Sequence, residues 1–174
     1  MVKEYKKIAY VWKEPKEKVI VPDRCHFKKV TQDLEDTFKK VINRVVVNSL
    51  DREDKKHIKP ESICELVDLY FNVDDDHFQY NKEWWELAYY NDQIVGFIQP
   101  VVFKGSEKNG LMEGTIHYIG VVPELRGRGF INDLLLRATR VLQDNGVWRI
   151  FSDTDVENMP MRAAFEKVGY EKWK

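Results

Sequence analysis

The chain has 174 residues with a hydrophobic fraction of 43%, which suits one domain with a core of ordinary size. Its 28 Lys and Arg nearly balance its 29 Asp and Glu, and this net charge of -1 argues against a dedicated nucleic-acid binder. The longest apolar stretch, residues 94–103, is too short to span a membrane, and the charged residues 1–12 are unlike a signal peptide.

The first half of the chain predicts short strands and two helices. Residues 8–12 and 19–22 indicate a hairpin, an N-terminal extension over residues 1–24, and residues 25–30 a third strand. Apolar residues then recur at helical spacing over 34–46, with Thr31 or Asp33 as a cap; a strand at 45–47 is the weaker alternative. Residues 51–59 are charged and loop-like, and a second helix runs over 60–71.

The second half predicts a hairpin followed by alternating strands and helices. Strands over 83–90 and 93–103 flank the turn residues Asn91 and Asp92, and a long strand follows over 111–123. A helix over 130–144, a strand over 148–152, a helix over 158–168 and a final strand from Tyr170 complete the chain. This order is typical of an α+β fold with one parallel crossover near its end.

The segment from Arg126 to Gly129 lies between a predicted strand and a predicted helix. Gly127 and Gly129 allow a sharp turn and close approach to a ligand, and the first amides of the helix have no internal partner. Together with the helix dipole they favour a diphosphate, and Arg126 and Arg128 add positive charge. The alternative is a tight turn with two solvated arginines, because two glycines alone are weak evidence.

Two motifs in the correct order resemble the GNAT superfamily of acyl-CoA-dependent N-acyltransferases. The first is the strand, Val-x-Pro and Arg-x-x-Gly sequence over 121–129, and the second is Asn158, a helix, and Phe165 to Tyr170. The resemblance covers residues 25–174. It implies a mixed, mostly antiparallel twisted sheet with helices on both faces, and two parallel strands that splay apart to admit the pantetheine of acetyl-CoA.

The resemblance also implies a set of cofactor-binding residues: Val121, Val122, Arg126, Gly127, Arg128, Gly129, Phe130, Ile131, Asn158 and Phe165. Backbone groups of Val121 and Val122 would pair with the pantetheine, and amides at a bulge near Val121 would stabilise the oxyanion. Asn158 would bind the pantetheine, cap its own helix, or both. Two departures stand out. Ile131 replaces a small residue, so it either crowds the pyrophosphate or points into the core, and Phe165 replaces the tyrosine that often acts as general acid.

Two residues are candidates for the base that must deprotonate the amine. His117 lies near the middle of the strand over 111–123, where the alternative is a hydrogen-bonded core histidine. Glu86 interrupts an apolar run, where the alternative is a solvent-facing position.

The predicted function is direct transfer of an acetyl group from acetyl-CoA to a primary amine of a small molecule or peptide. The alternatives are a catalytically degenerate acyl-CoA-binding module, favoured by Ile131 and Phe165, and an interaction domain without CoA. Cys25 and Cys64 give neither a disulfide framework nor a metal spacing, so we expect no metal and a cytoplasmic location. We expect no membrane partner, and the edge strands and N-terminal hairpin could support a homodimer.

Overall fold

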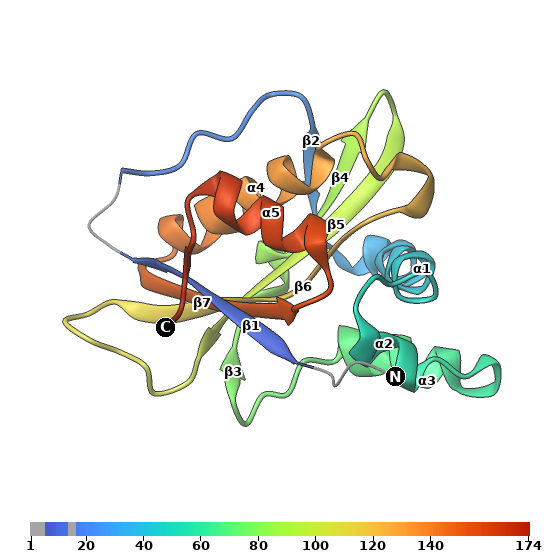
Figure 1. The fold of residues 1–174 in the computed structure, drawn as a ribbon, viewed down its shortest axis with the longest axis horizontal. Coiled ribbons are helices and arrows are strands. Elements are labelled where there is room, and N and C mark those ends of the chain that lie inside the picture. Colours follow the sequence, from blue (N-terminus) through green and yellow to red (C-terminus); the bar gives the residue numbers. More distant parts are fainter. Residues whose placement is uncertain (1–5, 14–16) are drawn as a thin grey trace.

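The computed structural model describes residues 6–13 and 17–174, and its frame is a mixed sheet in the order β2-β4-β5-β6-β7-β1-β8, with β3 paired to β5 (Figure 1). The strands are β1 Lys7–Lys13, β2 His26–Lys29, β3 Phe78–Gln79, β4 Glu86–Tyr90, β5 Gln93–Phe103, β6 Met112–Val121, β7 Val147–Asp155 and β8 Glu171–Lys172. Among the strands of the described residues, only β6 and β7 are paired in parallel; the other pairs are antiparallel. The predicted α+β class and the mostly antiparallel sheet are therefore confirmed.

Helices lie on both faces of this sheet, as predicted. They are α1 Glu35–Val46, α2 Arg52–His57, α3 Ile63–Phe71, α4 Phe130–Asp144 and α5 Met159–Val168. Two glycines of neighbouring strands show the two faces, because Gly96 of β5 turns toward Leu134 of α4 and Gly120 of β6 turns toward Val45 of α1. The missing side chain of Gly120 lets α1 lie close to β6, and a side chain at Gly96 would collide with the backbone oxygen of Gly120 as well as with Leu134.

The predicted N-terminal hairpin is wrong. Residues 17–22 contain no strand, residues 14–16 lie outside the described part of the chain, and β1 pairs along its whole length with β7, from Lys7–Asp155 to Lys13–Arg149. Burial explains this placement, since Tyr10 and Trp12 are 0% and 2% exposed and join the main core. The N-terminal strand is thus an inner strand of the sheet.

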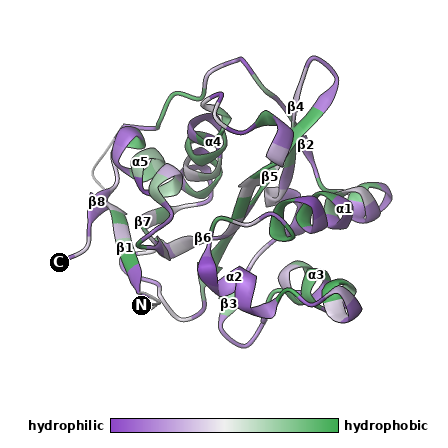
Figure 2. Cartoon of the chain, turned by 45° about the vertical axis from the view of Figure 1, so that its right-hand side comes forward, coloured by the Kyte–Doolittle hydropathy of each residue, from purple (hydrophilic) through white to green (hydrophobic). Residues whose placement is uncertain are grey.

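A second correction concerns residues 51–59, which form α2 instead of a loop. Asp51 caps the helix by accepting a hydrogen bond from the backbone nitrogen of Glu53, 2.8 Å away. Acidic residues lie in its first turn and basic residues in its last, which matches the helix dipole. The helix is hydrophilic along its length (Figure 2), and the missing apolar period explains why the pattern was not recognised.

Candidate active site

The two parallel strands β6 and β7 pair for only part of their length and then separate. Backbone pairing runs from Met112–Val147 to Gly114–Ile150. At the next step the hydroxyl of Ser152 takes the place of a backbone partner and accepts a hydrogen bond from the nitrogen of Ile116, 3.1 Å away. Beyond Ser152 the strands diverge, so the predicted splay is present in the structure.

The splay opens into a cleft of about 370 Å³. Its walls come from β6, β7, the loop before α4, the start of α5, and the segment from the end of α1 into α2. This volume falls within the range of small-molecule sites. Most of the residues predicted to bind the cofactor line it, namely Val121, Arg126, Gly127, Gly129, Phe130, Ile131, Asn158 and Phe165.

The loop before α4 has the backbone geometry of an anion site. Gly127 and Gly129 have φ values of +72° and +78°, a left-handed conformation that favours glycine. Gly129 is the N-cap residue and offers no side chain, so the first-turn amides of this 15-residue helix stay available to a ligand. The side chain of Phe130 is buried beneath the guanidinium of Arg24, 3.8 Å from the ring centre, so only the backbone of this residue faces the loop.

Arg126 has a different role from the predicted one. Its Nε donates to the carbonyl oxygen of Val121 at 3.0 Å, its Nη1 to that of Asn48 at 2.6 Å, and its Nη2 to that of Val45 at 3.4 Å. The guanidinium therefore ties the loop to the end of α1 and is not free for a phosphate. Arg128 lies exposed in the same loop.

Val122 is also placed differently from the prediction. Its backbone nitrogen donates to the carbonyl oxygen of Val95 in β5, 2.8 Å away, so this group points away from the cleft. The bulge of β6 lies at His117 and not near Val121, because the register with β5 shifts between Tyr118 and Ile116. Opposite this shift is Pro100, which has no backbone donor and is found in sheets mainly at edges and bulges.

The second motif lies across the cleft from β6. Asn158 caps α5, since its Oδ1 accepts a hydrogen bond from the nitrogen of Met161, 3.4 Å away. Phe165 is 2% exposed and its ring stacks on Tyr10 with the ring centres 4.8 Å apart. Ile131 lines the cleft in the first turn of α4 and is partly buried against the core. Phe165 thus forms a firm apolar wall and cannot donate a proton.

His117 lines the cleft at the bulge of β6. Its Nε2 is buried without a hydrogen-bond partner in the described part of the chain, and its ring packs edge-on against Phe78. Burial lowers the pKa of this imidazole to about 4, so it is neutral at physiological pH. The alternative prediction is a core histidine with a hydrogen bond to a neighbour. It does not hold for Nε2, because this atom has no such hydrogen bond among the described residues.

Glu86 lies outside the cleft. It is 2% exposed in β4, and both carboxylate oxygens accept 2.6 Å hydrogen bonds from Arg137 of α4. The predicted solvent-facing position is therefore wrong, and the paired carboxylate is not placed to act as the base. The Glu86 carboxylate in turn raises the pKa of Arg137.

We expect Glu86→Gln to lower the free energy of unfolding by about 2 kcal/mol, because a charge-assisted bidentate pair is lost. Denaturant melts would measure this change, with Glu83→Gln, an exposed neighbour, as the control. The catalytic rate constant of the folded variant should stay at the parent value, and a large fall in that constant would contradict the structural role.

Sequence reasoning missed a cluster of polar side chains where α2 lines one end of the cleft. The carboxylate of Asp54, 6% exposed, accepts hydrogen bonds from the hydroxyls of Ser49, Tyr70 and Tyr118, the last at 3.0 Å. Tyr70 and Tyr118 stack with ring centres 4.4 Å apart. Desolvation, and then the charge of Asp54, raises the pKa of Tyr118 well above its ordinary value, so this phenol stays protonated. The helical charge pattern of residues 51–57 was the available signal.

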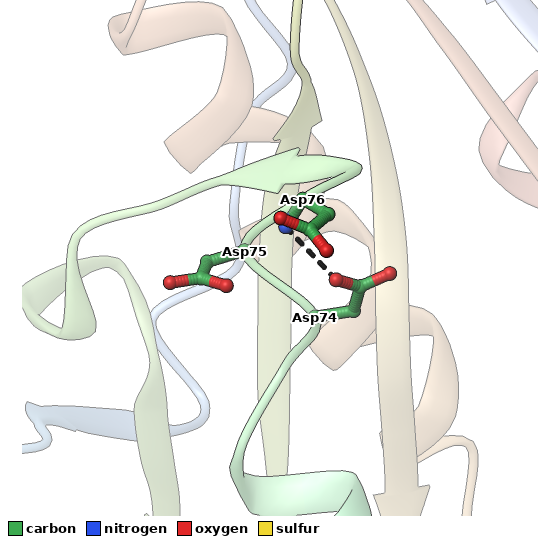
Figure 3. A group of neighbouring side chains, drawn as sticks. All are labelled: Asp74, Asp75 and Asp76. Atoms are coloured by element: carbon green, nitrogen blue, oxygen red, sulfur yellow. Dashed lines mark hydrogen bonds between the residues drawn. The ribbon is translucent and has the colours of Figure 1, made fainter.

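Asp74, Asp75 and Asp76 form the one group of three or more His, Cys, Asp or Glu side chains close enough to share an ion within residues 6–13 and 17–174 (Figure 3). All three are exposed and lie outside the cleft. Asp74 accepts a 2.8 Å hydrogen bond from the nitrogen of Asp76 and contacts His77, which explains the turn without a metal. In the described part of the chain no helix is both long and apolar enough to cross a membrane.

The structure thus combines a mixed sheet with one separated parallel pair, a glycine loop and a helix N-terminus, all beside one cleft. The family model described as "Acetyltransferase (GNAT) family" matches residues 47–170. The chain therefore belongs to the GNAT acetyltransferase family.

Individual relatives are distant. The chain is 26% identical over 98 residues to mycothiol acetyltransferase of Arthrobacter sp. (strain FB24), covering 53% of this chain and 30% of that protein. It is 24% identical over 121 residues to N-alpha-acetyltransferase 30 of Schizosaccharomyces pombe, covering 66% and 79%. The structure of AAC(6')-Iy in complex with a CoA bisubstrate analogue superposes with a TM-score of 0.58 at 14% identity, covering 86% and 92%. The chain thus spans less than a third of the mycothiol acetyltransferase that it matches.

Proposed function

We propose that this chain transfers the acetyl group of acetyl-CoA directly to a primary amine of a small molecule or peptide. The observation that carries the proposal is the cleft between β6 and β7, which joins the amides of the glycine loop to the polar groups of Asp54 and His117. The diphosphate would meet the amides of Gly129 to Ile131, and the pantetheine would run between the strands toward Asn158. When bound, acetyl-CoA supplies the activated thioester.

The chain's own residues have distinct tasks in this reaction. An alkyl ammonium is almost fully protonated at neutral pH, so one proton must leave before the nitrogen can attack. We propose that the neutral Nε2 of His117 accepts it and passes it to solvent. The nitrogen then bonds to the thioester carbon, the carbon–sulfur bond breaks, and the sulfur leaves with the electron pair. The second proton of the nitrogen goes to the thiolate, so the products are an amide, a free thiol and one released proton.

The missing tyrosine at Phe165 is compatible with this scheme. A thiol has an ordinary pKa near 8.5, so a thiolate leaves near neutral pH with little need for a proton donor. At the bulge of β6, the backbone of His117 has no paired residue in β5. We propose that an amide at this bulge stabilises the oxyanion.

The test is calorimetric titration of acetyl-CoA into the parent protein and two charge-matched variants. Arg128→Gln should weaken binding about tenfold, since one charge-assisted contact to phosphate is lost. Arg140→Gln is the control, because Arg140 pairs with Asp144 at the other end of α4 and should leave the affinity unchanged. Thiol release in the presence of amines then measures turnover.

Each outcome separates the candidate functions. Binding with amine-dependent thiol release supports the transferase. Binding without release under any amine would favour the degenerate acyl-CoA module that Ile131 and Phe165 also suggest. No heat and no thermal shift with acetyl-CoA would contradict both. We also propose a cytoplasmic location, which rests on the free thiols of Cys25 and Cys64. A homodimer remains a prediction, which size-exclusion chromatography with light scattering would test.

A further inference from the structure

The helix α2 bridges the two strands that separate to form the cleft. Arg52 contacts Asp155 at the end of β7 through Nε and Nη2, each 2.7 Å away, and through its backbone nitrogen at 3.1 Å. Two residues later, Asp54 accepts the hydrogen bond from Tyr118 of β6. One short helix is thus held to both strands, and it brings the Asp54 carboxylate to the wall of the cleft.

Asp54 is a buried carboxylate whose hydrogen-bond partners are all neutral. Within the described residues its three donors are hydroxyl groups, from Ser49, Tyr70 and Tyr118, and it has no ion pair. Among the basic side chains near Asp54, three pair with other carboxylates: Arg52 with Asp155, Lys56 with Glu53, and Lys7 with Asp153. Burying a carboxylate without a cation costs free energy of desolvation, so the Asp54 carboxylate would strongly attract a cationic group of a ligand.

The cation that binds Asp54 cannot be the amine that reacts. A neighbouring carboxylate stabilises the protonated form of an ammonium group and so opposes the loss of its proton. The attacking nitrogen must be neutral, and the neutral imidazole of His117 lines the same cleft. A ligand that satisfies both positions carries two basic nitrogens, one that remains charged and one that reacts.

We propose that the acceptor is a diamine or polyamine, with one ammonium held by Asp54 and a second nitrogen directed to the thioester near His117. This inference rests on the proposed function and specifies its acceptor. Tyr70 and Tyr118 fix the carboxylate and are positioning residues. An amino acid fits poorly, because its own carboxylate would lie in the same cleft as Asp54, and a single α-amine would leave Asp54 without a cation.

The experiment measures thiol release at saturating acetyl-CoA with linear diamines of three to six carbons and with monoamines of the same lengths. In the parent protein, the best diamine should exceed its matched monoamine in kcat/KM by on the order of 100-fold, as expected for a desolvated charge pair. In Asp54→Asn this ratio should fall close to one, because kcat/KM decreases for the diamine and stays at the parent value for the monoamine. Asp68→Asn is the control, since it removes an equal charge from an exposed residue of α3 that pairs with Lys39.

A second variant guards against loss of folding. Tyr118→Phe keeps the charge of Asp54 and removes one hydroxyl, so the diamine preference should fall by about tenfold and persist. Two readouts separate the two proposals: no acetyl-CoA binding in the parent protein, or binding without thiol release under any amine, ends the proposed function. If the parent acetylates amines, two results overturn the acceptor assignment: equal kcat/KM for diamines and monoamines, or an unchanged preference in Asp54→Asn.

Discussion

Arg52→Met should lower the free energy of unfolding by about 3–5 kcal/mol, because it leaves the carboxylate of Asp155 buried without a cation. Asp155 is 0% exposed, and the Arg52 guanidinium is the main reason that the pKa of Asp155 lies far below its usual range. Methionine keeps most of the length of the side chain, so the lost charge dominates the effect. Urea denaturation at neutral pH measures the change.

Two further variants define the origin of this loss. Asp155→Asn added to Arg52→Met should recover part of the stability, since the unpaired charge is then removed. Lys56→Met is the control on the same helix, where the pair with Glu53 is exposed and should contribute at most about 1 kcal/mol. Equal effects of Arg52→Met and Lys56→Met would show that the bridge from α2 to β7 does not stabilise the fold. The contribution of Asp155 is present at neutral pH and is lost as the pH falls below about 4, through its depressed pKa.

The second large effect is acid destabilisation by His117. Its pKa falls from 6.5 to about 4 on folding, so the unfolded chain binds one more proton between these values. The free energy of unfolding is therefore unaffected by this titration above pH 6.5. It decreases by about 3 kcal/mol as the pH falls to 4, at 1.36 kcal/mol per pKa unit. In His117→Gln this part of the pH dependence should disappear, as urea melts between pH 4 and 7 would show.

The same variant tests the proposed proton transfer. If His117 accepts the amine proton, His117→Gln should lower kcat by about 100-fold or more while the affinity for acetyl-CoA stays near the parent value. His57→Gln is the control, because His57 is exposed on α2 and pairs with Glu53. A normal kcat in His117→Gln would reject the catalytic role, whatever the effect of this variant on the pH dependence of stability.

Local sequence signals predicted the parts of the site that a short segment can encode. The glycines at 127 and 129, the helix caps at Asn158 and Gly169, and the Asn91-Asp92 turn all adopt the expected conformations. Residues in these turns are restricted by their own backbone, so neighbours in sequence are enough to identify them.

Long-range partners account for the failures. The role of Glu86 depends on Arg137, which is 51 residues away, and the orientation of Arg126 depends on carbonyl groups of Val45 and Asn48. Likewise, β1 pairs with β7 because buried aromatic side chains favour that position, and no local pattern distinguishes it from a hairpin. The Asp54 cluster combines residues from α2, α3 and β6, so only the folded chain brings it together.

The position of β1 also constrains the order of events during synthesis. Lys7 pairs with Asp155, and Tyr10 pairs with Lys172 of β8, so β1 cannot pair until these distant segments have been synthesised. Contacts this distant in sequence slow folding, because the loop must close before the contacts stabilise it. Until then the apolar side chains of β1 lack the neighbouring strands that bury them.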